Sequence, residues 1–240
     1  YGLENLALIP GSVGAAPVQN IGAYGVELAD LLHEVLWYDF DAEKVIKLNK
    51  AACNFGYRES IFKRELSGKG LVVEITLALP KAWQARRNYA GINELPVDAT
   101  ARDIYNKVIE IRRQKLPDPA IIPNAGSFFK NPVISRTQLL KLQTRYPAIP
   151  CYNVSPQRVK IPAGWLIEQA GFKGSTHGNA GVHDKQALVL VNRGNATGDE
   201  VIALAKNVIT QVYKQFGITL EQEVRTVSCQ GFQKIEVNCG

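Results

Sequence analysis

The chain has 240 residues, of which 46% are hydrophobic and 21% charged, and its formal net charge is +6. This composition is typical of a globular protein, and the length suffices for one large or two smaller cores. The longest apolar run, Leu71 to Leu79, has only the length of a strand, and the first residues lack a signal sequence. Basic residues are scattered instead of forming a stripe, so we predict neither a membrane nor a nucleic-acid partner.

Cysteine and histidine spacing argues against a metal site. Cys53, Cys151, Cys229 and Cys239 form no CxxC pair, and they are predicted to be free thiols of a cytosolic protein, although a Cys229–Cys239 bridge stays open. The His177–His183 stretch is glycine-rich and lacks metal-ligand spacing. The chain contains no Met, which fits a chain that begins inside a longer protein.

Predicted elements in the first half are mostly strands. Residues 33–40, 44–48 and 71–79 are rich in Val, Ile and aromatics, and the short gaps between them favour an antiparallel or mixed sheet. A helix is predicted to begin near Thr100, with Asp103 completing a capping box, and to end before Pro117. The stiff Leu116-Pro-Asp-Pro119 linker predicts a domain boundary.

The second half is predicted to be α+β. Its expected elements are helices over 135–142 (capped by Ser135), 163–170 (closed by Gly171) and 199–216 (ended by Gly217), and a buried strand over 187–191. The tail from Glu221 alternates weakly and is predicted to return to the first domain. The predicted domains are therefore 1–114, 115–218 and a returning tail, 219–240.

Gly11 to Gly25 is a run of small residues with almost no charge. Such a backbone can approach a ligand closely, and its N–H groups can bind pyrophosphate oxygens. The run matches neither a P-loop, because no Lys follows Gly14, nor a GxGxxG fingerprint. The pattern alone slightly favours the alternative, a tight β-turn region that packs on itself.

Three further side chains suit chemistry on an anionic substrate. Ser127, in Asn124–Pro132, is a candidate proton donor, although a turn with a buried Phe pair is the simpler interpretation. Arg58 beside Tyr57 suits a carboxylate clamp, or else a salt bridge with Glu59 or a neighbour. Glu223 is a candidate general acid, or else part of a solvated charge run.

Taken together, these segments resemble the UDP-N-acetylenolpyruvoylglucosamine reductases over nearly the whole chain. The matching blocks, in the family's order, are Ile9–Gly25, Gly56–Lys63, Lys115–Pro119, Asn124–Pro132, Ala163–Gln169 and Glu223–Arg225. The resemblance implies an α+β chain, with a partial vanillyl-alcohol-oxidase/PCMH-type FAD-binding module followed by an α+β substrate-binding domain. The family's GGGSN loop, which binds the flavin pyrophosphate, does not precede Tyr1, so the first flavin-binding segment is expected to be missing.

The resemblance also implies a reaction. NADPH would reduce FAD, and the flavin would pass a hydride to the enolpyruvyl group of a UDP-sugar, giving the peptidoglycan precursor UDP-N-acetylmuramate. The expected enzyme is bacterial, cytoplasmic and monomeric, and serves cell-wall biogenesis, cell shape and division. Arg58 and Glu223 would flank the substrate carboxylate, with Glu223 protonated, and Ser127 would donate a proton to C2.

Binding residues carry over from the resemblance position by position. The implied flavin-binding residues are Gly11, Ser12, Gly14, Gln19, Asn20, Gly22, Ala23 and Gly25. The implied substrate-binding residues are Tyr89, Lys115, Asn131, Tyr152 and Gln186, with no metal. Two rival hypotheses are a flavoprotein oxidase of the same module, which would lack the Ser127 block and the Lys115 linker, and a fragment that binds a UDP-sugar without turnover.

Overall fold

The computed structural model describes residues 1–89 and 91–237, which belong to two compact units, Tyr1–Arg113 and Gln114–Gly240. Each unit combines helices with sheets whose strand pairs are antiparallel, so the prediction of an α+β chain is confirmed. Helix α2 (Ala101–Lys115) closes the first unit, and its last two residues fall in the second. Each unit is described in turn.

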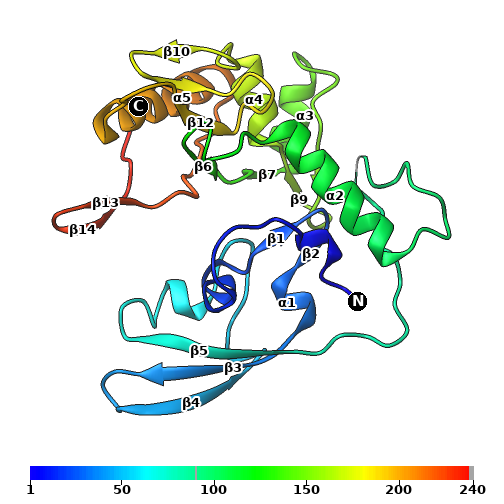
Figure 1. The fold of residues 1–240 in the computed structure, drawn as a ribbon. Helices are drawn as coiled ribbons and strands as arrows, with labels where there is room; N and C mark the ends of the chain where they lie inside the picture. The colour runs from blue at the N-terminus through cyan, green and yellow to red at the C-terminus, as the bar shows by residue number, and fades with distance from the viewer. Residues whose placement is uncertain (90, 238–240) are drawn as a thin grey trace. The chain divides into compact units, whose positions relative to one another are not determined.

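The first unit is built on a three-stranded antiparallel sheet (Figure 1). The strand order is β4 (Lys44–Asn49), β3 (Leu32–Asp39), β5 (Gly70–Leu77). All three predicted strands are present, each within two residues of the predicted bounds. The short connection over residues 40–43 requires β3 and β4 to run in opposite directions, and β5 also pairs with β3 in the antiparallel sense.

This unit contains two separate apolar clusters, one against the three-stranded sheet and one against α2. Trp37 of β3 packs on Phe62 in the 3-10 helix η3 (Ile61–Lys63), with ring centroids 5.3 Å apart. Ile104, Val108 and Ile111 of α2 form a separate buried stripe. That stripe confirms the helical periodicity predicted from the sequence.

Thr100 and Asp103 form the predicted capping box at the start of α2. The Asp103 carboxylate accepts from the Thr100 N–H at 2.8 Å and from the Thr100 hydroxyl at 2.6 Å, and the Asp103 N–H donates back to that hydroxyl at 3.2 Å. Aspartate replaces the usual glutamate here with the reciprocal geometry intact.

The glycine-rich segment is more regular than the turn alternative suggested. It contains the 3-10 helix η2 (Val13–Gln19) and a hairpin of β1 (Gly22–Ala23) and β2 (Val26–Glu27). Tyr24 and Gly25 both have positive φ, 50° and 81°, as a two-residue type I′ hairpin turn requires. The short elements η1 (Glu4–Leu6) and α1 (Leu28–Leu31) flank this segment.

The described part of the second unit contains two larger antiparallel sheets, a two-stranded hairpin near its C-terminal end and three helices (Figure 1). One sheet has the order β10-β11-β12-β6 and the other β7-β9-β8. The strands are β6 (Asn124–Ser127), β7 (Val133–Ser135), β8 (Tyr152–Asn153), β9 (Arg158–Lys160), β10 (Thr176–His177), β11 (Ala180–Val182) and β12 (Val189–Asn192); the helices are α3 (Arg136–Gln143), α4 (Ala163–Gln169) and α5 (Gly198–Phe216). Helix α5 contacts β11, β12 and α4.

The predicted helix signals of the second unit are confirmed. The Ser135 hydroxyl accepts from the Gln138 N–H at 3.1 Å and caps α3. Gly171 (φ 80°) and Gly217 (φ 63°) follow α4 and α5 in the left-handed conformation, where glycine lacks the steric cost of a Cβ. On α5, Leu204, Val208, Val212 and Phe216 are buried and form one apolar stripe.

The strand predicted over 187–191 begins later, at Val189, and this is a correction. Ala187 and Leu188 belong to a turn, in which the Val189 N–H donates to the Gln186 carbonyl at 3.0 Å and the Leu188 N–H donates to Gln186 Oε1 at 3.3 Å. The apolar run continued the pattern of a strand, but the side chain of Gln186 organises its first two residues as a turn.

The tail of the second unit forms the hairpin of β13 (Thr226–Ser228) and β14 (Gly231–Gln233). The residues before this hairpin pair with the segment Ser127–Lys130, here called the serine segment, through a bridge between Phe129 and Gln222. The return of the tail to the first domain stays a prediction. Cys229 is exposed, and Cys239 lies outside the described residues.

No helix within the described part of the chain is both long and apolar enough to cross a membrane.

Candidate active site

The predicted site residues fall into two sets. The first unit holds Arg58, Tyr89 and the eight predicted flavin-binding residues between Gly11 and Gly25. The second unit holds Lys115, at the end of α2, together with Ser127, Asn131, Tyr152, Gln186 and Glu223.

The glycines of the first set serve two different purposes. At Gly11 (φ 105°) and Gly25 (φ 81°), no atom lies within 4 Å of the position that a Cβ would take. At Gly22, by contrast, a Cβ would lie 2.9 Å from Glu27 Cγ and 3.1 Å from the Val26 carbonyl oxygen, so the protein itself requires that glycine. Gly11 and Gly25 therefore leave their backbone open to an incoming group, with the positive φ that glycine favours.

Asn20 anchors the end of η2 and is buried, with φ 46° in the left-handed region that asparagine tolerates. Its amide donates to Glu27 Oε2 at 2.8 Å and to the Gly56 carbonyl at 3.1 Å, and its Oδ1 accepts from the Ala29 N–H at 2.9 Å. The Asn20 side chain therefore connects the flavin segment to the Gly56–Glu59 turn.

Arg58 lies at the tip of that turn, in which Gly56 and Glu59 exchange backbone hydrogen bonds of 3.0 and 3.2 Å. Its φ is 56°, a conformation that an arginine rarely adopts. Its guanidinium donates to the Gly22 carbonyl at 2.8 Å and lies 5.4 Å from the centre of the Tyr57 ring. The first unit thus brings Arg58 into contact with the flavin segment.

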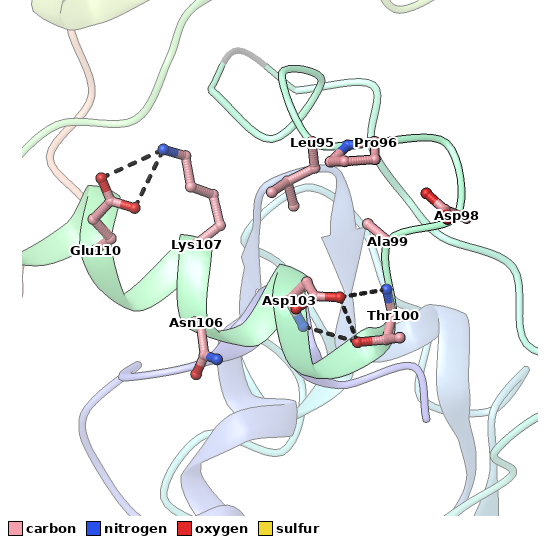
Figure 2. Close-up of a pocket in the computed structure, with 9 residues that line it drawn as sticks. All are labelled: Leu95, Pro96, Asp98, Ala99, Thr100, Asp103, Asn106, Lys107 and Glu110. Atoms are coloured by element: carbon pink, nitrogen blue, oxygen red, sulfur yellow. Dashed lines mark hydrogen bonds and ion pairs between the residues drawn. The ribbon is translucent and has the colours of Figure 1, made fainter.

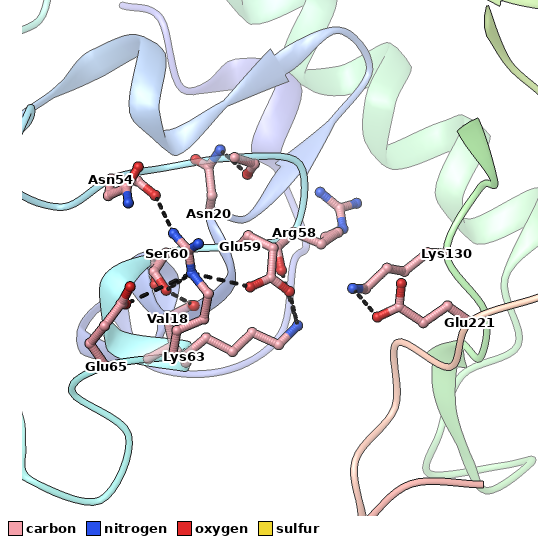
Figure 3. Close-up of polar contacts among 12 residues, drawn as sticks. Val18, Asn20, Asn54, Arg58, Glu59, Ser60, Lys63, Glu65, Lys130 and Glu221 are labelled. Carbon is pink, nitrogen blue, oxygen red and sulfur yellow. Dashed lines mark hydrogen bonds and ion pairs between the residues drawn. The ribbon is translucent and has the colours of Figure 1, made fainter. Parts of the chain in front are cut away.

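Neighbouring polar contacts hold the Arg58 turn in place (Figure 3). The buried Ser60 hydroxyl donates to the Val18 carbonyl at 2.6 Å, and the Lys63 ammonium donates to the Arg58 carbonyl at 3.0 Å. The Glu59 carboxylate pairs with Lys63 at 3.5 Å and with Arg64 at 3.8 Å. These contacts fix the backbone from which the guanidinium extends.

Tyr89, the predicted loop residue over the UDP moiety, is 40% exposed and packs edge-on against Tyr24 with ring centroids 5.0 Å apart. Burial raises the pKa of the Tyr24 hydroxyl, and the nearby Arg112 opposes that shift. Tyr89 is therefore placed by an aromatic contact with the hairpin that contains Ala23 and Gly25.

In the second unit, Ser127 ends β6 opposite Val189 of β12. Phe128 and Phe129 follow and are buried, with ring centroids 5.0 Å apart, as the simpler interpretation of this block predicted. The Phe128 N–H donates to the Leu188 carbonyl at 2.7 Å. The buried Phe pair thus holds the chain immediately after Ser127, and the serine itself is half-buried.

Glu223 is bonded to the same short segment. Its N–H donates to the Phe128 carbonyl at 2.8 Å, and the Val224 N–H reaches that carbonyl at 3.4 Å. Ser127 and Glu223 are 96 positions apart in the sequence. The backbone of Glu223 is nevertheless hydrogen-bonded to Phe128, the residue that directly follows Ser127. The second unit therefore brings together two of the three predicted catalytic residues.

Gln186 and Asn131 lie close to this segment. The Gln186 side chain accepts from the Leu188 N–H, and the Leu188 carbonyl in turn bonds Phe128. A Cβ on Gly164 would approach Gln186 Oε1 at 3.0 Å, so the small residue leaves room for that amide. The Asn131 side chain accepts from the Ala163 N–H at 2.9 Å and thereby caps α4.

The remaining predicted substrate residues lie at exposed positions. Tyr152 is 55% exposed in β8, at the edge of the smaller sheet. Lys115 is exposed as the last residue of α2.

Within the described residues, no group of three or more His, Cys, Asp or Glu side chains could hold a metal ion. His183 is buried, and its Nδ1 accepts from the Lys185 N–H at 3.3 Å while Nε2 lies 3.2 Å from Asp184 Oδ1. His183 therefore organises the turn that precedes Gln186.

A cavity of about 610 Å³ lies elsewhere, along the solvent-facing side of α2 (Figure 2). It is lined by Leu95, Pro96, Asp98, Ala99, Thr100, Asp103, Asn106, Lys107 and Glu110, and none of these is a predicted site residue. Asp103 is engaged in the capping box, and Lys107 pairs with Glu110 at 3.2 Å. The polar groups of this cavity thus serve the helix itself.

The sequence analysis did not predict two residues of the site region, Lys130 and Glu221. The Lys130 side chain is only 9% exposed, and its ammonium lies 2.5 Å from Glu221 Oε1. A lysine directly after two buried phenylalanines was a signal that this charge needs a partner. Its partner, 91 positions away, follows from no local pattern.

Comparisons with known proteins show the family of this chain. Residues 117–227 match the family model described as UDP-N-acetylenolpyruvoylglucosamine reductase, C-terminal domain. The chain is 52% identical over 237 residues to the UDP-N-acetylenolpyruvoylglucosamine reductase of Shewanella oneidensis, covering 98% of this chain and 70% of that protein. It is 50% identical over 229 residues to the protein of the same name from Burkholderia ambifaria, covering 92% of this chain and 66% of that protein.

A solved structure shares the fold. The crystal structure of UDP-N-acetylenolpyruvylglucosamine reductase from Thermus caldophilus superposes with a TM-score of 0.59 at 24% identity, covering 93% of this chain and 63% of that chain. The chain therefore spans about two thirds of the length of these relatives.

Proposed function

The chain belongs to the UDP-N-acetylenolpyruvoylglucosamine reductase family, and we propose that it carries the substrate half and part of the flavin site of such a reductase. The substrate is the enolpyruvyl ether of UDP-N-acetylglucosamine, the product is UDP-N-acetylmuramate, and the reaction serves peptidoglycan precursor synthesis in the bacterial cytoplasm. We propose a monomeric enzyme.

One observation carries this proposal. The Glu223 N–H donates to the carbonyl of Phe128, so the backbone of Glu223 is hydrogen-bonded to the residue that directly follows Ser127. Reduction of an enolpyruvyl group requires a hydride at C3 and a proton at C2, and negative charge develops at C2 and the adjacent carboxylate between these steps. Two residues that carry a hydroxyl and a carboxyl on hydrogen-bonded neighbouring segments suit the roles of the proton donor and of the group that stabilises this charge.

The remaining roles follow from charge and position. When bound, the flavin would supply the hydride to the substrate after receiving it from NADPH. Gly11, Gly25 and the backbone between them would hold part of the FAD, because their positions are open. Arg58 would bring positive charge to the substrate carboxylate, and its anchoring to the Gly22 carbonyl ties that charge to the flavin segment. Glu223, protonated, would donate a hydrogen bond to the same carboxylate.

Substrate contacts complete the proposal. Lys115 and Tyr89 would contact the diphosphate and the UDP moiety, and Asn131, Tyr152 and Gln186 would hold the rest of the sugar nucleotide. Support for Gln186 is its place in the turn that bonds the serine segment, whereas Tyr152 and Lys115 rest on their exposure alone.

The proposal is tested by separating the two half-reactions in the flavin-loaded enzyme. We expect Ser127→Ala to leave flavin reduction by NADPH unchanged. Reoxidation by the enolpyruvyl substrate should slow on the order of 100-fold or more, because the proton donor is lost. Stopped-flow absorbance of the flavin measures both steps.

A matched control removes a hydroxyl elsewhere in the same unit. Thr137→Ala, on the exposed side of α3, should change neither half-reaction. Normal reoxidation in Ser127→Ala would exclude Ser127 as the proton donor.

A further inference from the structure

Lys130 places a charged side chain in the apolar part of the second unit. It directly follows Phe128 and Phe129, which are 4% and 1% exposed, and its own side chain is 9% exposed. Glu221, whose side chain is 68% exposed, reaches in from the tail and lies 2.5 Å from the ammonium (Figure 3). The pair therefore joins a buried cation to an anion at the surface.

The ion pair sits on a ladder of backbone hydrogen bonds. The Lys130 N–H donates to the Glu221 carbonyl at 2.8 Å, Phe129 is bridged to Gln222, and the Glu223 N–H donates to the Phe128 carbonyl at 2.8 Å. Lys130 and Glu221 are thus opposite each other, two residues from Phe128 and Glu223. The ion pair and the proposed catalytic carboxyl share one register.

This register is short and needs a specifying contact. A ladder of so few bonds can slip by one residue, and a slip moves every side chain of the tail to the other face. Burying an ammonium without a partner carries a desolvation cost of several kcal/mol, and a well-placed carboxylate offsets that cost. A one-residue slip would bring Leu220 or Gln222, neither of them charged, opposite Lys130, so the buried ammonium disfavours that slip.

We propose that the Lys130–Glu221 ion pair is a positioning device that fixes the register of the tail against the serine segment and so sets Glu223 relative to Ser127. The device rests on the proposed function for its effect on catalysis. Lys130 and Glu221 are positioning residues, and they act through the backbone that Glu223 and Phe128 share.

The first test is kinetic and uses the flavin-loaded enzyme. Glu221→Ala removes the exposed partner, and Lys130→Met removes the buried one while keeping an apolar side chain of similar length. In both variants we expect flavin reoxidation by the enolpyruvyl substrate to slow on the order of 10- to 100-fold, as small misplacements of catalytic groups do. Flavin reduction by NADPH should stay unchanged, because neither Glu223 nor Ser127 takes part in it.

Two matched variants control for stability and for charge. Glu221→Asp keeps the carboxylate and should recover most of the lost rate. Lys173→Met breaks the Lys173–Glu168 pair of the same unit, which spans 2.8 Å between side chains 35% and 47% exposed, and should leave both half-reactions unchanged.

The second test reads the register directly and requires no turnover. Hydrogen exchange of the Glu223 and Lys130 amides should accelerate about tenfold or more in Glu221→Ala, because local opening of the ladder becomes easier. Amides of α5 should exchange as in the unmodified protein.

Each outcome decides the proposal. Unchanged reoxidation, an equal loss in both half-reactions, or unchanged exchange at Glu223 would each overturn it. If the unmodified enzyme fails to reoxidise its flavin with the enolpyruvyl substrate, the proposed function falls, and the exchange measurement alone still decides whether the pair fixes the register.

Discussion

At the residue scale, Asn20 shows how one side chain links the cofactor segment to the Arg58 turn. Its three hydrogen bonds reach Glu27, Ala29 and Gly56, and its left-handed backbone suits asparagine better than most residues. A buried amide with three half-buried partners is costly to lose, because each of them loses its hydrogen bond to Asn20. Asn20 thus supports the flavin segment from within, whatever direct contact it makes with a cofactor.

We expect Asn20→Ala to destabilise the first unit by about 2–4 kcal/mol, since it leaves several half-buried polar groups unsatisfied. Denaturant unfolding followed by tryptophan fluorescence measures the change. As a control, Asn49→Ala removes a single exposed bond to the Ala52 N–H and should cost less than about 1 kcal/mol. Equal effects of the two substitutions would show that Asn20 is not an anchor.

The cysteines differ sharply in their surroundings. Cys53 is fully buried, and burial raises the pKa of its thiol to about 11, so almost no thiolate exists at neutral pH. Cys151 and Cys229 are exposed.

In a Cys239→Ser background, we expect a disulfide reagent at pH 8 to modify Cys151 and Cys229 rapidly and Cys53 only as the unit opens. Counting released chromophore against time measures this, and all three thiols should react at once in denaturant. Three rapid equivalents in the folded protein would contradict the burial of Cys53.

At the element scale, helix caps decide where the helices begin. The Asp103 carboxylate accepts hydrogen bonds from the Thr100 hydroxyl and from the Thr100 backbone N–H. These bonds, the hydroxyl's with the larger effect, hold the pKa of Asp103 below its usual value. A lowered folded pKa means that Asp103 stabilises the fold at pH values above the unfolded pKa. That stabilisation is lost as the pH falls through the folded value.

Accordingly, Asp103→Asn should lower stability at pH 7, and the difference from the unmodified protein should shrink as the pH falls below about 4. Thermal unfolding across this pH range measures the trend. The exposed Glu94→Gln in the loop before α2 serves as the control and should show a smaller effect at pH 7. A difference that grows on acidification would have the wrong sign for this mechanism.

At the scale of the whole molecule, the chain carries separate cores in its two units. The second unit has one large cluster, whereas the first has two smaller ones, under the sheet and under α2. Trp37 and Trp83 lie in the first unit and Trp165 in the second, and these are all three tryptophans of the chain. Fluorescence can therefore follow each unit by itself.

We expect Leu166→Ala, at a fully buried position, to destabilise the second unit by about 2–5 kcal/mol. The unfolding midpoint reported by Trp165 in a Trp37→Phe/Trp83→Phe background should fall. The midpoint reported by Trp37 in a Trp83→Phe/Trp165→Phe background should fall less. Equal shifts would show that the chain unfolds as one cooperative unit.

Local patterns were sufficient for the longer helices, for the three long strands of the first unit and for the family. The strands of the first unit, the caps at Thr100 and Ser135 and the stop at Gly217 depend on residues within a few positions of one another, so the sequence alone predicts them. The motif order from Ile9 to Arg225 likewise predicted the reductase family, which the comparisons confirm. The turn at Ala187 was missed because a side chain, not the apolar pattern, organises it.

Tertiary structure alone decided which distant residues meet. Glu223 bonds the Phe128 carbonyl, Arg58 bonds the Gly22 carbonyl, and Lys130 pairs with Glu221 across 91 positions. None of these contacts has a periodic or local signature, because each is set by how sheets and tail pack. A charged residue expected to be buried indicates that a partner is required, but only the fold determines which residue reaches it.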